Sequence, residues 1–393
     1  MIGSMSEVAR YLKKSLCRVS LSLIKISPIK KKRVIFVNNL ILNYSANPRY
    51  VAEYLMKQYP EKFEIIFSVR NPEKYKVTGH KIKFIKFNSL QYFYYALTSK
   101  VFLTNSGGTS YLPIRKSQYV INTHHGGGAY KKCGMDMFED TKLFRKDLKL
   151  SSDRTSVFLS TNKKFTQVIS DAILLDKEKF WEIGMPRNDI LIHPDEKLVS
   201  EIKNKLNLNG KKLALYAPTY RKPDDNYFKE SIAIDYGLDS KMVCSALKER
   251  FGGEWVLGLR LHPCVVNDYK IQDDNVINLS NYEEMQELLL ASDVMINDFS
   301  SSMWDFMLTG KPCFTFAKDL QHYVETTEVY TPVSQWPFPQ STTNEKLAQD
   351  ILNFNEDDYR KACKKHYDAL GGCETGEACK LVCERIYDVC YHN

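Results

Sequence analysis

The feature that most constrains the fold is an alternation of short apolar runs with helix-like stretches, which occurs in two successive series. The first series has strand-length runs at residues 33–39, 64–69, 82–87, 101–106, 118–125 and 156–161. The second series has such runs at residues 212–219, 255–262, 276–280, 294–298 and 312–317. Stretches with helical periodicity, such as 48–58 and 90–98, lie between the runs. Strands joined by crossover helices form parallel sheets covered by helices, so the sequence predicts an α/β chain with two Rossmann-like domains.

The division between the two domains is predicted where this alternation pauses. A chain of 393 residues is long enough for two domains, each with its own core. The pattern pauses over residues 180–189, and a charged helix-like stretch follows at 196–207. We therefore expect an N-terminal segment at 1–32, a first Rossmann-like domain at 33–195 and a second at 196–393.

The N-terminal segment is strongly basic. Residues 1–33 contain nine basic side chains and one acidic side chain, so they carry the whole formal net charge of +8. A helical projection places apolar side chains on one face, namely Val8, Leu12, Leu16, Val19, Leu23 and Ile26. The basic side chains lie on the opposite face, namely Arg10, Lys13, Lys14, Arg18 and Lys25. The pattern fits a helix lying on an anionic membrane surface, or a helix whose apolar face packs on the body of the protein.

Other classes of partner and location follow from composition. Nucleic acid is not expected as a partner, because the basic residues gather on one terminal segment without a nucleic-acid-binding motif. No apolar run approaches the ~18 residues of a membrane span, and residues 1–20 lack the apolar core of a signal peptide. Ten cysteines without such a signal indicate a reducing compartment. We expect a cytoplasmic protein that lies peripherally on the inner face of the cell membrane.

The cysteines themselves are expected to pack rather than to bind metal. Half of them crowd the C-terminus, and the sequence has no Cys-x-x-Cys pair. Cys379 and Cys383 are four residues apart and would share one face of a helix. Free cysteine is among the most buried residue types, so helix packing is the preferred interpretation.

A candidate phosphate site lies where the apolar run at 294–298 passes into a helix-like stretch. Three consecutive serines, Ser300, Ser301 and Ser302, occupy this junction, and Gly310 and Pro312 end the helical pattern. Hydroxyl groups and free backbone N–H groups at a helix start favour a bound phosphate. The alternative is an ordinary helix start in which Ser302 and Asp305 form a capping box.

A second candidate site follows the run at 118–123. His124 and His125 precede three glycines, which allow a ligand to approach the backbone, and Lys131 and Lys132 add positive charge nearby. A His-Gly-Gly-Gly run also occurs in the oxyanion loop of esterases. That function requires a Gly-x-Ser-x-Gly nucleophile elbow, which this sequence does not contain.

Further polar residues follow other predicted strands. Thr219 and Arg221 come after the run at 212–218, and Arg260 and His262 end the run at 255–262. Ligands of parallel α/β sheets bind beyond the carboxyl ends of the strands, so we expect His262 to be functional rather than a structural histidine. The turn at 184–189 contributes Arg187 and Asn188, for which a binding role and a structural role are equally open.

These motifs, in this order, make the chain resemble the bacterial CDP-glycerol glycerophosphotransferase family, which primes and polymerises teichoic acids and related capsule polymers. The resemblance covers most of the chain. It rests on residues 47–50, the His125-Gly126 loop with Lys131 and Lys132, and residues 186–189, 217–221, 260–263, 297–305, 311–312 and 376–388.

The resemblance implies a GT-B fold, with two Rossmann-like domains facing each other across a cleft. It implies transfer of glycerol phosphate, or a similar polyol phosphate, from CDP-glycerol or a related CDP-polyol to a hydroxyl of a lipid-linked or polymer acceptor. CMP is released. The domain at 33–195 would take the acceptor and the domain at 196–393 the CDP donor.

The resemblance also implies roles for individual residues. His125 would deprotonate the acceptor, and His262 would act at the pyrophosphate. The donor would be bound by Thr219, Arg221, Arg260, Asp298, Ser300, Ser301, Ser302 and Asp305. Contacts with the acceptor or with phosphate would come from Lys131, Lys132, Arg187 and Asn188.

The residue chemistry agrees with this function. Phosphoryl transfer needs positioning and neutralisation of charge more than covalent chemistry, and histidine titrates near neutral pH. No cofactor or metal is expected, because the sequence has no Asp-x-Asp motif. The family usually has tryptophan where this chain has His124, so the choice between His124 and His125 as the base stays open. The alternatives are a GT-B glycosyltransferase that uses a nucleotide sugar and a non-enzymatic module that binds anionic polymer.

Overall fold

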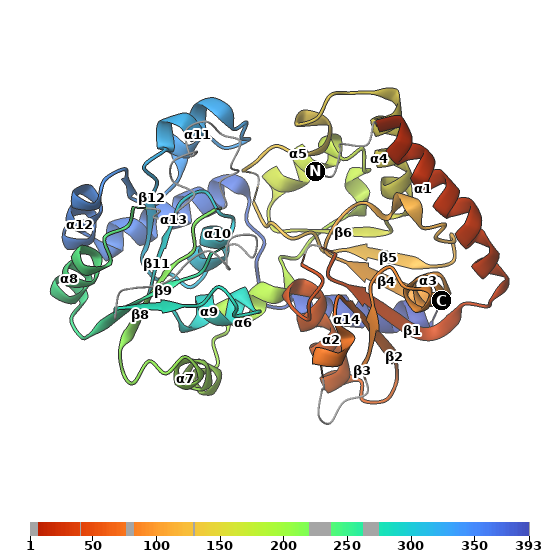
Figure 1. Cartoon of the computed structure of the whole chain (residues 1–393), viewed down its shortest axis with the longest axis horizontal. Coiled ribbons are helices and arrows are strands. Elements are labelled where there is room, and N and C mark those ends of the chain that lie inside the picture. Colours follow the sequence, from red (N-terminus) through yellow and green to blue (C-terminus); the bar gives the residue numbers. More distant parts are fainter. Residues whose placement is uncertain are drawn as a thin grey trace. The chain divides into compact units, whose positions relative to one another are not determined.

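The computed structural model describes residues 7–39, 41–75, 82–128, 130–219, 237–261 and 275–392. The chain divides into two compact units, each with its own sheet and helices (Figure 1). Unit 1 comprises Met1–Asp189 and Leu370–Asn393, and unit 2 comprises Ile190–Ala369. This confirms the predicted α/β class with two parallel-sheet units.

Unit 1 is built on a seven-stranded sheet of order β3-β2-β1-β4-β5-β6-β7, in which every pairing among the described residues is parallel. Apart from the exposed lysines that begin β1, its central strands are almost entirely buried, as expected for a parallel sheet covered on both faces. The strands are β1 (Lys30–Val37), β2 (Glu64–Val69), β3 (Ile82–Lys86), β4 (Ser99–Thr104), β5 (Tyr119–Asn122), β6 (Val157–Ser160) and β7 (Phe180–Glu182).

Three helices of unit 1 begin after residues whose side chains accept a hydrogen bond from a free N–H group of the first turn. Ser89, Thr141 and Asn162 accept hydrogen bonds from the amides of Tyr92, Phe144 and Phe165, at 3.2, 3.1 and 2.7 Å. These residues precede α3 (Leu90–Thr98), α4 (Lys142–Arg154) and α5 (Lys163–Ala172). The other long helices of the unit are α1 (Glu7–Leu21), α2 (Ala46–Gln58) and α14 (Ala378–Tyr391).

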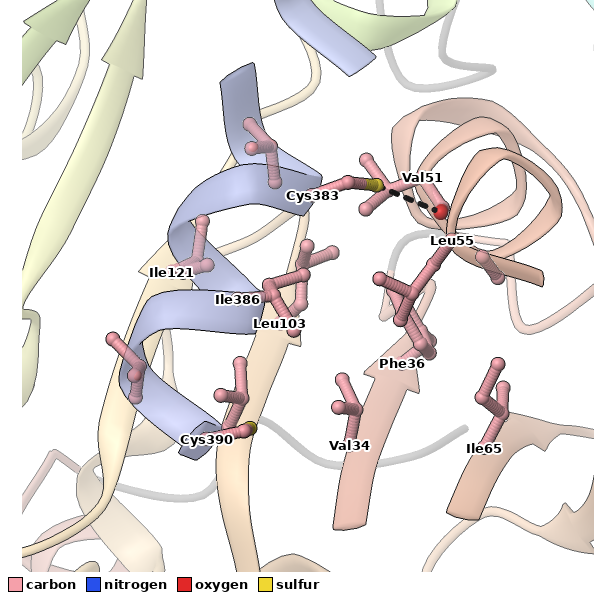
Figure 2. Packing of buried hydrophobic residues seen from close by; sticks show 14 of the residues in the cluster. Val34, Phe36, Val51, Leu55, Ile65, Leu103, Ile121, Cys383, Ile386 and Cys390 are labelled. Carbon is pink, nitrogen blue, oxygen red and sulfur yellow. Dashed lines mark hydrogen bonds between the residues drawn. The ribbon is translucent and has the colours of Figure 1, made fainter. Parts of the chain in front are cut away.

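The last helix of the chain, α14, belongs to the core of unit 1. Figure 2 shows its residues Cys383, Ile386 and Cys390 facing β1, β4 and α2. All three are at most 4% exposed, and the Cys383 thiol donates to the Val51 carbonyl at 3.5 Å. The C-terminal cysteines therefore pack, as expected. The predicted second domain, 196–393, differs from the structure here, because Leu370–Asn393 lie in unit 1.

Two carboxylates fix the point where the chain returns to unit 1. Asp189 accepts hydrogen bonds from the amides of Ala378 and Cys379, at 3.1 and 2.7 Å, and so caps the start of α14. Glu374 accepts from the amide of Met185 at 3.0 Å and from the side-chain amide of Asn188 at 2.8 Å. Segments nearly 200 residues apart in sequence are thus joined by hydrogen bonds rather than by apolar packing alone.

We expect unit 1 to depend on α14 for stability. Replacing Ile386, which is fully buried, with alanine is expected to lower the free energy of unfolding by about 2–5 kcal/mol, because the transfer energy is lost and a cavity is left. Glu384→Ala, on the exposed side of the same helix, is the control and is expected to change it by less than about 0.5 kcal/mol. Urea unfolding monitored by circular dichroism measures both. Equal midpoints for the two variants would contradict this role for α14.

Unit 2 contains a six-stranded sheet of order β10-β9-β8-β11-β12-β13, again parallel at every pairing among the described residues. Its strands are β8 (Lys212–Tyr216), β9 (Trp255–Leu259), β10 (Val276–Asn278), β11 (Val294–Asn297), β12 (Cys313–Phe316) and β13 (Gln340–Ser341). Its helices are α6 (Asp189–Ile192), which starts at the unit boundary, α7 (Glu196–Lys205), α8 (Ser240–Phe251), α9 (Met285–Ala291), α10 (Ser302–Met307), α11 (Leu320–Thr326), α12 (Asn344–Leu352) and α13 (Glu356–Leu370).

Each sheet has one point at which the strand order reverses. In unit 1 it lies between β1 and β4, and in unit 2 between β8 and β11. The connections on the two sides of such a point run in opposite directions, which leaves a crevice beyond the strand ends where ligands bind. The candidate site residues can therefore be located relative to these two points.

The N-terminal helix α1 exposes the apolar face that the sequence predicts. Along α1 and the 3₁₀ turn at Ser22–Ile26, the exposed fractions rise from 54% at Val8 to 86% at Ile26. Leu12, Leu16, Val19 and Leu23 lie between 55% and 73%. A helix packed on the body through this face would bury these side chains, so that alternative does not agree with the structure. Among the described residues, none of the helices combines the length and the apolar composition that crossing a membrane requires.

Candidate active site

The histidine loop of unit 1 leaves the sheet through a tight turn after β5. His124 has a φ of 52°, a left-handed conformation that is uncommon for residues other than glycine. The Asn122 side chain accepts from the His124 amide at 2.9 Å, and the Asn47 side chain donates to the His124 carbonyl at 3.1 Å. Because of this turn, His124 and His125 do not alternate as they would in a strand. Their rings stack with centroids 4.3 Å apart.

The His124 ring packs among aromatic side chains. The rings of Phe158 and Phe165 each lie 5.5 Å from it, and Nδ1 lies 3.1 Å from the Gly126 carbonyl oxygen and 3.2 Å from the Gly126 nitrogen. Burial, followed by the neighbouring His125, lowers the pKa of His124 to about 3. His124 is therefore neutral at physiological pH, and its ring packs against that of His125.

His125 lies beside the point of strand reversal in unit 1. Its Nδ1 is 3.3 Å from the carbonyl oxygen of Asn105, which follows β4 directly. Burial lowers the pKa of His125, the bond to Asn105 raises it, and the charge of Arg187 lowers it further, with a net fall below 6.5. A partly exposed, neutral imidazole can accept a proton at neutral pH.

Arg187 and Asn188 are buried and hold the histidine loop and the C-terminal segment in place. Arg187 is 6% exposed; its amide donates to the Asn47 side chain at 3.0 Å and its guanidinium to the His125 carbonyl at 2.7 Å. Asn188 is 1% exposed and bonds Glu374. Of the two roles left open by the sequence, the structural one fits both positions. Lys131 is exposed and Lys132 is partly exposed just beyond the loop.

In unit 2, Thr219 and Asp298 form a hydrogen-bonded pair beside the point where the strand order reverses. Thr219 follows β8, and its amide and hydroxyl donate to the Asp298 carboxylate at 2.9 and 2.6 Å. The Phe299 amide also donates to this carboxylate, which is 2% exposed. Asp298 was expected to contact the donor. Its contacts fix Thr219 and the start of the serine segment in place, and a contact with the donor stays a prediction.

The three serines lie directly after this pair. Ser300 is partly exposed, Ser301 is exposed and Ser302 is buried at 8%. The hydroxyls of Ser300 and Ser302 are 3.1 Å apart, and Asn297 donates to the Ser302 hydroxyl at 3.1 Å. The capping-box alternative is not observed, since Ser302 is itself the first residue of α10 and the N-cap residue, Ser301, makes no side-chain capping bond.

Two other residues predicted to bind the CDP donor are Asp305, which is buried, and Arg260, which is partly exposed. Asp305 is 4% exposed and accepts from the side-chain amide of Gln286 at 2.8 Å. The Arg260 guanidinium donates to the Tyr282 carbonyl at 3.1 Å and contacts the sulfur of Met285. Burial lowers the pKa of Arg260 to about 10, and the nearby Glu284 opposes the shift, so the side chain keeps its charge at neutral pH.

His262 and Arg221 lie outside the described residues, so the structure does not place these two predicted site residues. Within the described ranges, no three His, Cys, Asp or Glu side chains are grouped so as to hold a metal ion.

Sequence reasoning missed the polar residues that position the histidine loop. Asn38 and Asn105 are 0% and 1% exposed at the ends of β1 and β4, and Asn47 is fully buried in the first turn of α2. A signal for the first two was present, because each asparagine follows an apolar run at a predicted strand exit. Nothing in the sequence indicated that they would bond each other.

The family model for CDP-Glycerol:Poly(glycerophosphate) glycerophosphotransferase matches residues 19–388, almost the whole chain. The chain belongs to this family. Curated relatives agree: it is 29% identical over 374 residues to a teichoic acid poly(glycerol phosphate) polymerase of Staphylococcus epidermidis, covering 91% of this chain and 51% of that protein. It is 27% identical to a teichoic acid glycerol-phosphate transferase of Staphylococcus aureus, covering 88% of this chain and 90% of that protein.

The chain thus spans about half the length of the Staphylococcus epidermidis polymerase. The solved structure of the wall teichoic acid polymerase TagF matches 98% of this chain and 97% of the TagF chain, with a TM-score of 0.82 and 27% identity. The fold is therefore GT-B, as predicted. A histidine-to-asparagine variant of TagF, soaked with CDPG, matches with a TM-score of 0.81.

Proposed function

We propose that this protein transfers glycerol phosphate from CDP-glycerol to a hydroxyl group of a polymer or lipid-linked acceptor in teichoic acid synthesis. The observation that carries the proposal is His125, a neutral, partly exposed imidazole at the point of strand reversal in unit 1 of a chain from this family. Support for the donor comes from the CDPG soak of TagF.

The reaction requires one proton transfer and one exchange of bonds at phosphorus. The acceptor hydroxyl gives its proton to Nε2 of His125 as its oxygen attacks the phosphorus next to glycerol. A new P–O bond forms to the acceptor, and the bond from that phosphorus to the bridging oxygen breaks. CMP leaves with that oxygen and the electron pair. The protein contributes positioning and neutralisation of charge, which carry most phosphoryl-transfer catalysis.

Unit 2 would bind the donor. The hydroxyls of Ser300 and Ser301 and nearby backbone amides would hold the two phosphates, with Asp298 keeping Thr219 in place beside them. His262 and Arg221, from the segments outside the described residues, would add positive charge at the pyrophosphate, and Arg260 would support the same region. Lys131 and Lys132 would attract the anionic acceptor in unit 1.

The test is a comparison of donors. The purified full chain is incubated with a glycerol phosphate primer and either CDP-glycerol, CDP-ribitol or a UDP-sugar, and nucleotide release is followed by chromatography. We expect primer-dependent CMP release from CDP-glycerol. Primer-dependent UDP release from a UDP-sugar, with CDP-glycerol inert, would contradict the proposal in favour of the glycosyltransferase alternative.

The proposed location is the anionic inner face of the cell membrane, with α1 as the contact. The exposed apolar stripe from Val8 to Ile26 would enter the headgroup region. Exposed cations on the same segment would add long-range attraction to anionic lipid, namely Arg10, Lys13, Lys25, Lys30, Lys31 and Lys32. Beside the stripe, α1 and Phe93 of α3 line a groove of about 520 Å³.

The side of α1 opposite the stripe forms hydrogen bonds and an ion pair with the rest of unit 1. Lys14 pairs with Asp147, and Glu7 accepts from Thr141, both partners being in or next to α4 (Figure 1). Arg18 donates to the Ser110 carbonyl at 2.8 Å. Lys14 and Arg18, which the sequence places opposite the apolar stripe, thus attach the helix to the rest of unit 1. A helix held by its polar side and exposing its apolar side supports membrane contact.

We expect this stripe to control vesicle binding. Replacing Leu12, Leu16 and Val19 together with asparagine is expected to weaken binding to phosphatidylglycerol vesicles by at least about tenfold, because each buried apolar side chain contributes about 1.5–3 kcal/mol. The fold should persist, since all three are more than half exposed. Leu352→Asn, an exposed leucine of α12, is the control. Sedimentation with vesicles measures binding, and unchanged binding by the triple variant would contradict the proposed contact.

A further inference from the structure

Two buried asparagines, Asn38 and Asn105, are joined by a hydrogen bond at the strand-reversal point of unit 1. The Asn105 side-chain amide donates to Asn38 Oδ1 at 2.8 Å, and Asn105 Oδ1 accepts from the Asn39 amide at 3.0 Å. Both side chains of the pair are at most 1% exposed. The Asn105 side chain therefore bridges the ends of β1 and β4.

The Asn38 side chain is also held by hydrogen bonds to the loop that follows β1. Asn38 Nδ2 donates to Asn43 Oδ1 and to the Ser45 hydroxyl, each at 2.9 Å. These residues lie in the loop between β1 and α2. The donors and acceptors of the two amides are thus matched across three segments of the chain, and a buried network with all its members bonded is rigid and specific.

The network ends at the histidine proposed as the base. The backbone carbonyl of Asn105 lies 3.3 Å from Nδ1 of His125, so it can only accept a hydrogen bond from an Nδ1–H group. In a neutral imidazole, a proton on Nδ1 leaves the lone pair on Nε2. The identity of the basic nitrogen is therefore set by where the Asn105 carbonyl is held.

We infer that Asn38 and Asn105 are positioning residues, which hold the Asn105 carbonyl against His125 so that Nε2 is the nitrogen that accepts the acceptor's proton. The inference rests on the proposed function, and it names the residues that orient the base. Neither asparagine touches substrate; each acts through His125. A purely structural role would require only that the pair stabilise the ends of β1 and β4.

The kinetic test uses Asn105→Ala and Asn38→Ala in the full chain. Turnover is expected to fall about 10- to 100-fold, the usual effect of removing a residue that orients a reacting group. The KM for CDP-glycerol is expected to change by less than about twofold, because donor binding belongs to unit 2. A fall in turnover with an unchanged pH profile, or no fall at all, would overturn the inference.

The pH profile distinguishes orientation from simple destabilisation. The groups that face His125 are the ring of His124, the charge of Arg187 and the Asn105 carbonyl, of which only the carbonyl raises the pKa of His125. Weakening the hydrogen bond between the Asn105 carbonyl and His125 would therefore lower the pKa of His125 further. Turnover is lost at acid pH because the base becomes protonated. In both variants this loss is therefore expected to occur at lower pH, and the plateau value of turnover is expected to fall.

Gln118→Ala is the matched control. Gln118 is a 4% exposed amide that donates to the carbonyls of Ala96 and Ser99 at 2.9 and 2.8 Å, at the opposite, amino end of β5. Its loss is expected to lower stability by a similar amount, about 1–3 kcal/mol for unsatisfied buried groups. Turnover and the pH profile should remain those of the unmodified chain.

A second measurement does not depend on turnover. Nitrogen-15 spectra of histidine-labelled protein report which ring nitrogen carries the proton, and His125→Gln identifies the His125 signals. We expect the Nδ1–H form in the unmodified chain and a mixture of both forms in Asn105→Ala. If CDP-glycerol is not turned over but this shift is seen, the positioning stands and the proposed donor fails. If His125 keeps one form in both proteins, the positioning fails whatever the activity.

Discussion

Replacing His125 with alanine is expected to lower turnover of CDP-glycerol by about 10²–10⁴-fold, the usual contribution of a positioned general base. Its pKa lies below 6.5, so the imidazole is neutral at pH 7 and can take a proton. Donor affinity should hardly change, because the serine segment lies in unit 2. Single-turnover kinetics give the rate of the chemical step, and equilibrium dialysis with CDP-glycerol gives the affinity.

The sign of the pH dependence follows from the same lowered pKa. A base must be deprotonated to act, so turnover is lost as pH falls through the folded-state pKa of His125. Because this value is lower than 6.5, the plateau is expected to extend below pH 6.5 before activity declines. A decline that begins above pH 6.5 would indicate a different base.

His124 is the matched control for His125. Its ring is enclosed by Phe158 and Phe165, and with a pKa of about 3 it is neutral throughout the working range. His124→Phe keeps an aromatic support under His125 and is expected to be milder than His125→Ala. If His124→Ala proves inactive while His125→Ala keeps its activity, the base is His124 and the assignment is off by one residue.

The second large effect is expected at the serine segment. Replacing Ser300 and Ser301 together with alanine removes two hydroxyls proposed to bond donor phosphate, and each bond to a charged group contributes about 1.5–3 kcal/mol. The Kd for CDP-glycerol is therefore expected to rise by about 10²–10⁴-fold. The backbone amides remain, so binding should be weakened rather than abolished. Isothermal titration with CDP-glycerol measures the change.

The control for this pair is another serine of unit 2. The Ser200 hydroxyl bonds the Glu196 carbonyl of its own helix at 2.9 Å, so Ser200→Ala removes a hydroxyl without touching the proposed site. Its affinity for CDP-glycerol should match that of the unmodified chain. If the double variant binds the donor as tightly as Ser200→Ala does, donor phosphate is not held by these serines.

The sequence was sufficient to predict both sheets and the ends at which the candidate sites lie. Buried parallel strands form continuous apolar runs, and polar residues mark their carboxyl ends, which is why His125, Thr219 and Ser300 could be singled out. The strands β7 and β13 were missed because runs of three and two residues carry no recognisable pattern.

Contacts between segments that are distant in the chain could not be predicted from the sequence. Helical periodicity indicates which face of α14 is apolar, but not that this face covers the sheet of unit 1. The carboxylate of Asp298 bonds Thr219, 79 residues away, which no local pattern indicated. The Asn38–Asn105 pair joins residues 67 apart. Such pairings depend on the register of neighbouring strands, which local patterns do not specify.

The identity of the transferred group tests the proposed function most directly. CDP-glycerol is prepared with ³²P at the phosphorus next to glycerol and ³H in the glycerol, and is incubated with the full chain and a glycerol phosphate primer. If glycerol phosphate moves as one group, both isotopes enter the primer in equal amounts and the released CMP is unlabelled. Tritium entering the primer without ³²P, or both isotopes released into water with the primer unlabelled, would contradict the proposed transfer.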